Sequence, residues 1–236
     1  GGAHGFDKRV WDYAPVPGGI AFSRVSPEGE EGFPGALAVT VTYTLLRDGI
    51  CIRYEAESTR DTFVSLTNHA YFNLAGHGNG SVLDHTLALA AEEYTPAGAD
   101  NLPFGRLAPV GGTALDFCTE NSLGARIGDA LLAPLHGYDH NFALSGRGIR
   151  RAAKLSCPRS GVSMAVDTTM EGMQLYTANF LSARAGKGGV QYEPYSGVCL
   201  ETQRFPDAMH HAAFPSPLLR AGMRYDERTE YRFTLA

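Results

Sequence analysis

Apolar and polar residues alternate with a period of two along several stretches of the chain. The clearest stretches are residues 36–46 (ALAVTVTYTLL) and 49–58 (GICIRYEAES), both rich in Val, Ile, Thr and Tyr. This period and these residue types predict half-buried antiparallel β-strands. The dipeptide Asp48-Gly49 at their junction is a strong hairpin signal, so we expect the two strands to pair with each other.

Further strand-like runs follow, with turn residues between them. They are residues 62–74 and 83–91 and the segments KLSCP, GVSMAVDTTM, GMQLYTANFL, GVCLETQ and YDERTEYRFTLA. Only residues 122–132 (SLGARIGDALL) fit a helix, and a short one. Strand after strand without intervening helices predicts an all-β sandwich or barrel. The chain has no linker long enough to divide it, which favours one large domain over two small ones.

The composition supports the β assignment and narrows the choice of partner. Of the 236 residues, 28 are Gly and 13 are Pro, which indicates many turns. The net charge is −5 and the 20 basic residues are scattered, so we expect binding neither to nucleic acid nor to an anionic membrane. No apolar stretch approaches the roughly 20 residues of a membrane span. A neutral small molecule fits this charge pattern best.

The cysteines indicate the redox environment. Cys51, Cys118, Cys157 and Cys199 lie far apart and form no Cys-x-x-Cys pair, a pattern typical of reduced thiols. No charged-then-apolar signal segment opens the sequence. We therefore expect a cytoplasmic protein, and a signal segment upstream of Gly1 would lie outside this sequence.

Two segments combine polar and aromatic side chains. In TNHAYFNL, His69 interrupts an apolar run, with Asn68 and Asn73 beside it. A histidine in such a run is usually a hydrogen-bonded core residue, but several polar neighbours on one strand indicate a wet pocket. In GYDHNFAL, Asp139 and two polar neighbours stand between aromatic residues. That composition suits a sugar site and equally a turn whose Asp bonds its own backbone.

A third segment, GVCLETQRFPDA, places Glu201 at the end of an apolar strand. A carboxylate that is partly removed from water by apolar neighbours has a raised pKa, which suits a general base near neutral pH. A lone Glu is more often solvated or paired with a cation. The segment therefore indicates a candidate base, and the sequence alone leaves both interpretations open.

Other chemistries have weaker support. The eight histidines show no zinc-site spacing, and the chain has no G-x-S-x-G, Walker or G-x-G-x-x-G motif. A glycosidase could use Asp139 and Glu201 as its carboxylate pair, at a separation that the sequence does not give. A sugar-phosphate epimerase needs a basic cluster, for which only Arg204 and Arg220 are candidates.

Taken together, the segments LTNHAYFNLAG, GYDHNFAL, GMQLYTANFL and GVCLETQRFPDA resemble those of the aldose 1-epimerases, or galactose mutarotases. The opening GGAHGFDKRVW and the segment SPEGEEGFPGALAVTVTYTL are also similar, and all occur in the family's order over nearly the whole chain. The resemblance implies an all-β fold, a large antiparallel β-sandwich of the galactose mutarotase-like supersandwich type. It also implies that neither a metal nor an organic cofactor is required.

The resemblance implies roles for individual residues. His69 would donate a proton to the ring oxygen of the sugar, and Glu201 would take the proton of the anomeric hydroxyl. Asp139 and Gln174 would bind sugar hydroxyls, and Asn68 is a further candidate for substrate binding. The implied reaction interconverts the α and β anomers of a free hexose such as galactose or glucose.

The chain departs from the family pattern in its loops and at its start. The loop before Gly105 differs, and His210 and His211 stand where the family has other residues. Family members place a Leu-His-Gly-Gly segment and several strands ahead of GFDK, whereas this chain begins at Gly1-Gly2. We therefore expect one N-terminally truncated domain, residues 1–236, without the family's first strands. The alternatives are a non-catalytic sugar-binding protein and an inactive fragment, and the sequence does not indicate the oligomeric state.

Overall fold

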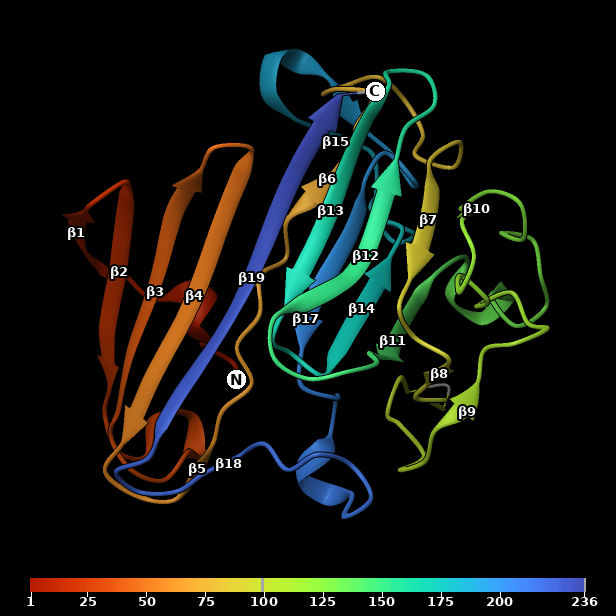
Figure 1. Ribbon diagram of the computed structural model, residues 1–236. Coiled ribbons are helices and arrows are strands. Elements are labelled where there is room, and N and C mark those ends of the chain that lie inside the picture. Colours follow the sequence, from red (N-terminus) through yellow and green to blue (C-terminus); the bar gives the residue numbers. More distant parts are fainter. Residues whose placement is uncertain (99, 236) are drawn as a thin grey trace.

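The computed structural model describes residues 1–98 and 100–235, which form β-strands, turns and short 3-10 helices (Figure 1). This part of the chain contains no α-helix. Its 3-10 helices are η1 (Phe6–Lys8), η2 (Glu30–Gly32), η3 (Ala133–Leu135), η4 (Lys187–Gly189) and η5 (Ala208–His210). Among the described residues, no helix has the length and apolar character needed to cross a membrane.

The larger sheet is antiparallel throughout and has nine strands within the described residues. In spatial order they are β1 (Asp12–Val16), β2 (Gly19–Ser26), β3 (Leu37–Leu46), β4 (Gly49–Ser58), β19 (Arg224–Leu235), β13 (Val162–Thr168), β12 (Arg150–Ser156), β7 (Thr86–Leu89) and β10 (Asn121–Ser122). The strands predicted at residues 36–46 and 49–58 are confirmed as β3 and β4, and they pair as expected.

The hairpin between β3 and β4 differs in one detail from the sequence signal. Its two-residue loop is Arg47-Asp48, and Gly49 is already the first residue of β4. The backbone of β19 passes so close that a Cβ atom on Gly49 would lie 1.9 Å from the carbonyl oxygen of Tyr231. Gly49 is therefore required by this close approach of two strands.

The smaller sheet has six antiparallel strands within the described residues. In spatial order they are β6 (Tyr71–Phe72), β17 (Val198–Gln203), β14 (Gly172–Tyr176), β11 (Asp139–Ala143), β8 (Glu93–Tyr94) and β9 (Ala108–Pro109). Two short ribbons complete the strands, β5 (Thr62–Phe63) with β18 (Leu218–Leu219) and β15 (Arg184–Ala185) with β16 (Gln191–Tyr192).

The two sheets pack face to face on one hydrophobic core. Figure 1 shows β17, β14 and β11 behind β13, β12 and β7 of the larger sheet. Leu155 and Tyr231 of the larger sheet share this core with Leu200 and Leu175 of the smaller one, each at most 1% exposed. The burial of apolar surface, at about 25 cal/mol per Å², is the main stabilising contribution. The predicted β-sandwich is confirmed.

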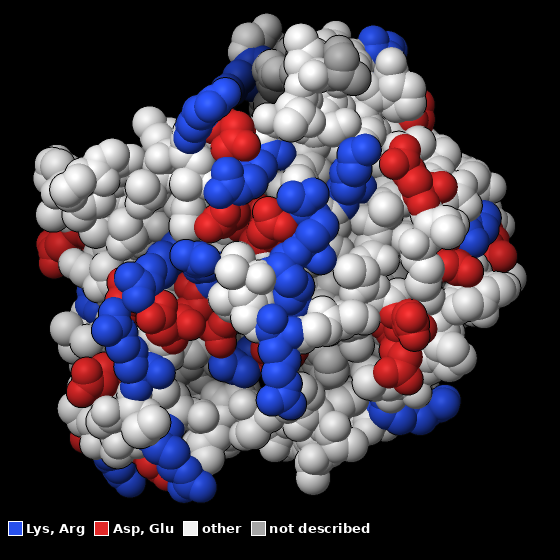
Figure 2. All heavy atoms as spheres, in the orientation of Figure 1, with Lys and Arg blue, Asp and Glu red and all other residues white. Residues whose placement is uncertain are grey.

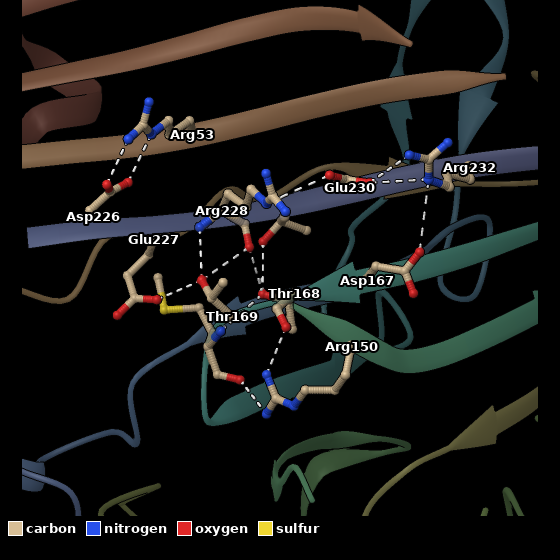
Figure 3. A network of polar contacts seen from close by, with 12 residues as sticks. Arg53, Arg150, Asp167, Thr168, Thr169, Asp226, Glu227, Arg228, Glu230 and Arg232 are labelled. Atoms are coloured by element: carbon tan, nitrogen blue, oxygen red, sulfur yellow. Dashed lines mark hydrogen bonds and ion pairs between the residues drawn. The ribbon is translucent and has the colours of Figure 1, made fainter. Parts of the chain in front are cut away.

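The outer face of the larger sheet is polar, and its charges are paired. Figure 2 shows Lys and Arg side chains interspersed with Asp and Glu on this face. Arg53 forms a two-pronged contact with Asp226, at 2.8 Å and 2.6 Å, and Arg232 donates to Glu230 at 2.8 Å (Figure 3). The Arg53–Asp226 pair is exposed to solvent on both sides, and such pairs contribute about 0–1 kcal/mol each. These pairs make the outer face hydrophilic, and the charges of Arg53 and Arg232 are neutralised by neighbouring carboxylates.

Two predictions of secondary structure are wrong. Residues 62–74 do not form one strand, because only β5 and β6 pair and residues 64–70 between them run as irregular chain. Residues 122–132 form consecutive turns after β10 instead of a helix. Gly124 brings its backbone N–H to the carbonyl oxygen of Leu83 at 2.8 Å, and glycine is a poor helix former. The four cysteines are free, as predicted.

Candidate active site

The polar face of the smaller sheet gathers most of the predicted site residues in two adjacent rows. Directly opposite residues of paired strands point to the same face of a sheet. One row, from β6 to β11, consists of Tyr71, Cys199, Tyr176 and Asp139. The next row consists of Glu201, Gln174 and Asn141. Strand pairing thus brings together residues that are far apart in sequence, such as Tyr71 and Cys199.

His69 lies on the irregular segment that leads into β6, and aromatic rings hold its imidazole. The ring stacks on Tyr71, with centroids 5.0 Å apart and planes 20° apart, and meets Tyr176 edge-on at 5.9 Å. Its Nε2 lies 3.5 Å from Oε1 of Glu201. The side chain is 53% exposed, so the imidazole is fixed in orientation and still accessible to a ligand.

Glu201 is a buried carboxylate on β17, which lies between β6 and β14, and 8% of its surface is exposed. Burial, and secondly the negative charge of Asp139, raise the pKa of Glu201 to about 7. The apolar neighbours in sequence predict this direction, and the structure confirms it. A carboxylate that gains and loses its proton near pH 7 is suited to general base catalysis at neutral pH.

Cys199 contacts the other ring nitrogen of His69, with Sγ 3.4 Å from Nδ1. Burial, followed by the charges of Glu201 and Asp139, raises the pKa of the Cys199 thiol. The thiol therefore stays protonated and can donate to Nδ1. In the neutral imidazole the ring proton then resides on Nε2, the nitrogen that faces Glu201.

Asp139 and Gln174 form a hydrogen-bonded pair beside Glu201. Nε2 of Gln174 donates to Oδ1 of Asp139 at 2.7 Å. Burial raises the pKa of Asp139, and the bond from Gln174 opposes this shift. Both side chains line a cavity of about 360 Å³, together with Tyr94 and Asn101. A carboxylate and an amide beside an aromatic ring are suited to bind sugar hydroxyls and C–H groups.

Asn68 lies elsewhere, although it precedes His69 in sequence. Its Nδ2 donates to the hydroxyl of Tyr54 at 2.9 Å, and its Oδ1 accepts from the hydroxyl of Tyr231 at 3.2 Å. Both tyrosines are buried residues of the larger sheet. With both ends of its amide engaged between the sheets, Asn68 anchors the segment that carries His69 and does not join the polar face.

His140 and two arginines also have structural partners. Nδ1 of His140 accepts the backbone N–H of Asp139 at 3.1 Å, and burial lowers the pKa of His140 to about 4, so the ring is neutral. Arg204 binds Glu171 at 2.9 Å and Glu227 at 3.1 Å, and Arg220 binds Asp61 at 2.7 Å. The two arginines that the sequence left as candidates for a phosphate site are therefore paired with carboxylates.

Two clusters among the described residues combine metal-ligand types, and one is His69, Cys199 and Glu201. The other is Asp84, His85 and Cys157. There, Nε2 of His85 accepts the backbone N–H of Leu74 at 3.0 Å, and Nδ1 lies 2.9 Å from Asp84. A neutral ring that accepts on Nε2 carries its proton on Nδ1, so both nitrogens of His85 are engaged and neither is free to bind a metal.

Sequence reasoning missed the contacts of Cys199, Tyr176 and Gln203. One signal was available, because Cys199, Glu201 and Gln203 alternate along β17 and therefore share a face. The pairing of that face with Tyr176 and Gln174 on β14 depends on the register between two distant segments, which no local pattern shows.

Comparison with known proteins finds similarity to aldose 1-epimerases and galactose mutarotases. A family model described as aldose 1-epimerase matches residues 1–232. Galactose mutarotases of Pongo abelii and Homo sapiens are 44% and 43% identical over 238 residues, covering 100% of this chain and 69% of each relative. The aldose 1-epimerase of Escherichia coli K12 is 35% identical over 240 residues, covering 99% of this chain and 69% of that relative.

Solved structures show the same fold. The aldose epimerase homologue from C. elegans superposes with a TM-score of 0.89 at 26% identity, covering 100% of this chain and 71% of that one. The galactose 1-epimerase of Lactobacillus acidophilus NCFM gives a TM-score of 0.84, also at 26% identity, covering 99% of this chain and 69% of that one. The two-sheet sandwich is thus a fold that these proteins share.

Proposed function

The chain belongs to the aldose 1-epimerase family, and we propose that Glu201 and His69 carry out its reaction, the interconversion of the α and β anomers of a free hexose. Galactose and glucose are the substrates we expect. The observation that carries this proposal is the separation of 3.5 Å between Nε2 of His69 and Oε1 of Glu201. The two sugar oxygens that exchange protons, O1 and O5, are bonded to the same carbon, C1, so the acid and the base must be neighbours.

The reaction proceeds by ring opening and closure. The carboxylate of Glu201 takes the proton of O1 while protonated His69 gives a proton to O5. The C1–O5 bond breaks and an aldehyde forms at C1. After rotation about C1–C2, O5 attacks the other face of the aldehyde, its proton returns to His69, and Glu201 gives its proton back to O1. Each assisted proton transfer contributes about 10²–10⁴-fold to the rate.

Asp139 and Gln174 hold the sugar during these steps. Oδ1 of Asp139 accepts from Gln174, and the carboxylate has a second oxygen to accept a sugar hydroxyl. Gln174 on β14 lies directly opposite Glu201 on β17, and Asp139 on β11 lies in the adjacent row, opposite Tyr176. A hexose bound by these two side chains therefore has its anomeric end within reach of Glu201 and His69.

The experiment compares free and blocked sugars. NMR exchange spectroscopy measures the rate of α to β exchange of galactose, and calorimetry measures its binding. We expect accelerated exchange with galactose and no reaction with methyl galactoside, which lacks a free anomeric hydroxyl. Binding without exchange would favour the non-catalytic sugar-binding protein instead. Release of methanol from the glycoside would indicate a glycosidase.

A further inference from the structure

A chain of hydrogen-bonded side chains adjoins the candidate active site and includes residues without a role in the proposed reaction. It ends at Asp139, the proposed partner of the sugar hydroxyls. The links are Asn141 Nδ2 to Thr95 Oγ1 at 3.3 Å, Gln203 Nε2 to Asn141 Oδ1 at 3.1 Å, Gln203 Nε2 to Gln174 Oε1 at 3.3 Å, and Gln174 Nε2 to Asp139 Oδ1 at 2.7 Å. Asn141 is 3% exposed, so the network lies largely inside the protein.

The carboxylate of Asp139 sets the direction of this network. An ionised carboxylate only accepts hydrogen bonds, so Gln174 must turn Nε2 toward Asp139 and Oε1 toward Gln203. Gln203 must then present its own Nε2, which donates to Gln174 and to Asn141. Reversing the amide of Gln203 would place two oxygens against each other at both contacts. Only one orientation of the Gln174 and Gln203 amides therefore satisfies all the partners.

Gly172 provides the space for this network. Asn141 and Gln203 belong to β11 and β17, which lie on either side of β14, so their backbones are about 9.5 Å apart. Gly172, on β14, lies opposite Gln203, on β17. A Cβ atom on Gly172 would lie 2.8 Å from Oδ1 of Asn141. Gly172 is not among the glycines with positive φ. Its lack of a side chain therefore matters for the space it leaves and not for its backbone conformation.

We propose that Gln203 is a positioning residue for the sugar site, which acts through Gln174 to hold Asp139 in its sugar-binding orientation. The assignment rests on the proposed function, because Asp139 and Gln174 are the hydroxyl partners of that reaction. Gln203 itself does not transfer a proton. Its loss should therefore weaken the binding of the sugar and have little effect on the chemical step.

The first test is Gln203→Met, which keeps the length of the side chain and removes its donor and acceptor. We expect KM and the calorimetric Kd for galactose to rise about tenfold, which corresponds to about 1.4 kcal/mol, with kcat within about twofold of wild type. The matched control is Gln191→Met on β16, an exposed glutamine outside the network. Unchanged KM and Kd in Gln203→Met would overturn the proposal.

A double-mutant cycle separates positioning from a general loss of structure. If Gln203 acts only through Gln174, the double variant Gln174→Met/Gln203→Met should bind galactose as tightly as the single variant Gln174→Met, within about twofold. Fully additive losses would contradict the proposal. Gly172→Ala is a second variant, which tests the proposal if Gln203→Met fails to fold. Its methyl group would displace Asn141 and should raise KM in the same way. An unchanged KM in Gly172→Ala would also contradict the proposal.

The binding measurements distinguish this proposal from the proposed function. A wild-type protein that binds galactose without anomer exchange would refute the epimerase reaction. The rise of Kd in Gln203→Met would still show that Gln203 positions the sugar site. Normal exchange in the wild type with an unchanged Kd in Gln203→Met would refute the positioning role alone.

Discussion

Nε2 of His69 lies 3.5 Å from Oε1 of Glu201. His69 is on the irregular segment that leads into β6, and Glu201 is on β17. This separation joins an imidazole to a carboxylate, whereas a glycosidase uses two carboxylates on either side of a glycosidic bond. An acid and a base this close together can serve O1 and O5 of the sugar, which are bonded to the same carbon, C1. Burial and the charge of Asp139 raise the pKa of Glu201 to about 7, so the role of Glu201 can be tested through the pH dependence of activity and of stability.

Replacement of the base should remove most of the catalysis. Glu201→Gln keeps the size of the side chain and cannot accept the O1 proton, so we expect kcat to fall about 10²–10⁴-fold. Polarimetry with freshly dissolved α-galactose measures the rate, and calorimetry should still detect sugar binding. Glu230→Gln is the matched control, because Glu230 is also 8% exposed and pairs with Arg232 on the outer face. A Glu201→Gln rate equal to that of wild type would show that Glu201 is not the base.

The activity should fall as the pH decreases through about 7. The base must be ionised, and kcat/KM reports the pKa of the free enzyme, so each pH unit below about 7 should cost about tenfold. Asp139→Asn removes the charge that contributes to the raised pKa of Glu201, and the acid limb of the profile should move to lower pH. An acid limb that stays in place in Asp139→Asn would mean that another group controls it.

Glu201 should make the folded protein less stable at alkaline pH. Its folded-state pKa of about 7 exceeds the ordinary value of 4.5, so its favourable contribution is complete below pH 4.5 and is lost as the pH rises through about 7. Glu201→Gln cannot ionise and should be more stable than wild type at pH 8, by up to about 3 kcal/mol at roughly 1.4 kcal/mol per pKa unit. Urea unfolding at pH 8 and pH 4.5 tests this. A difference of the same size at both pH values would contradict it.

Loss of the Asn68 amide should destabilise the protein. Asn68→Ala removes the donor to the buried hydroxyl of Tyr54, at a cost of about 1–3 kcal/mol, while the hydroxyl of Tyr231 still donates to the carbonyl oxygen of Leu200. Urea unfolding should show this loss, and Thr67→Ala, an exposed neighbour, should leave the stability unchanged. A variant of normal stability with a much higher KM would instead make Asn68 the substrate contact that the sequence analysis predicts.

Several features follow from the sequence alone. The period of two and the β-branched residues of 36–46 and 49–58 specify β3 and β4 and their pairing, because these signals are local. The apolar neighbours of Glu201 are adjacent in sequence, so the direction of its pKa shift could also be predicted. The family resemblance supplied candidate roles for His69 and Asp139, which local patterns alone left open between a core residue, a turn and a site.

Other features were decided by the tertiary structure. Asn68 and His69 are adjacent in sequence, yet one is bonded between the sheets to Tyr54 and Tyr231 and the other lies beside Glu201. The contact of Gln203 with Asn141 crosses an intervening strand and exists because Gly172 leaves room for it. Hydrophobic periodicity tells which residues share a face of one strand. The register between strands far apart in sequence decides which of those faces meet, and it is fixed only when the whole core packs.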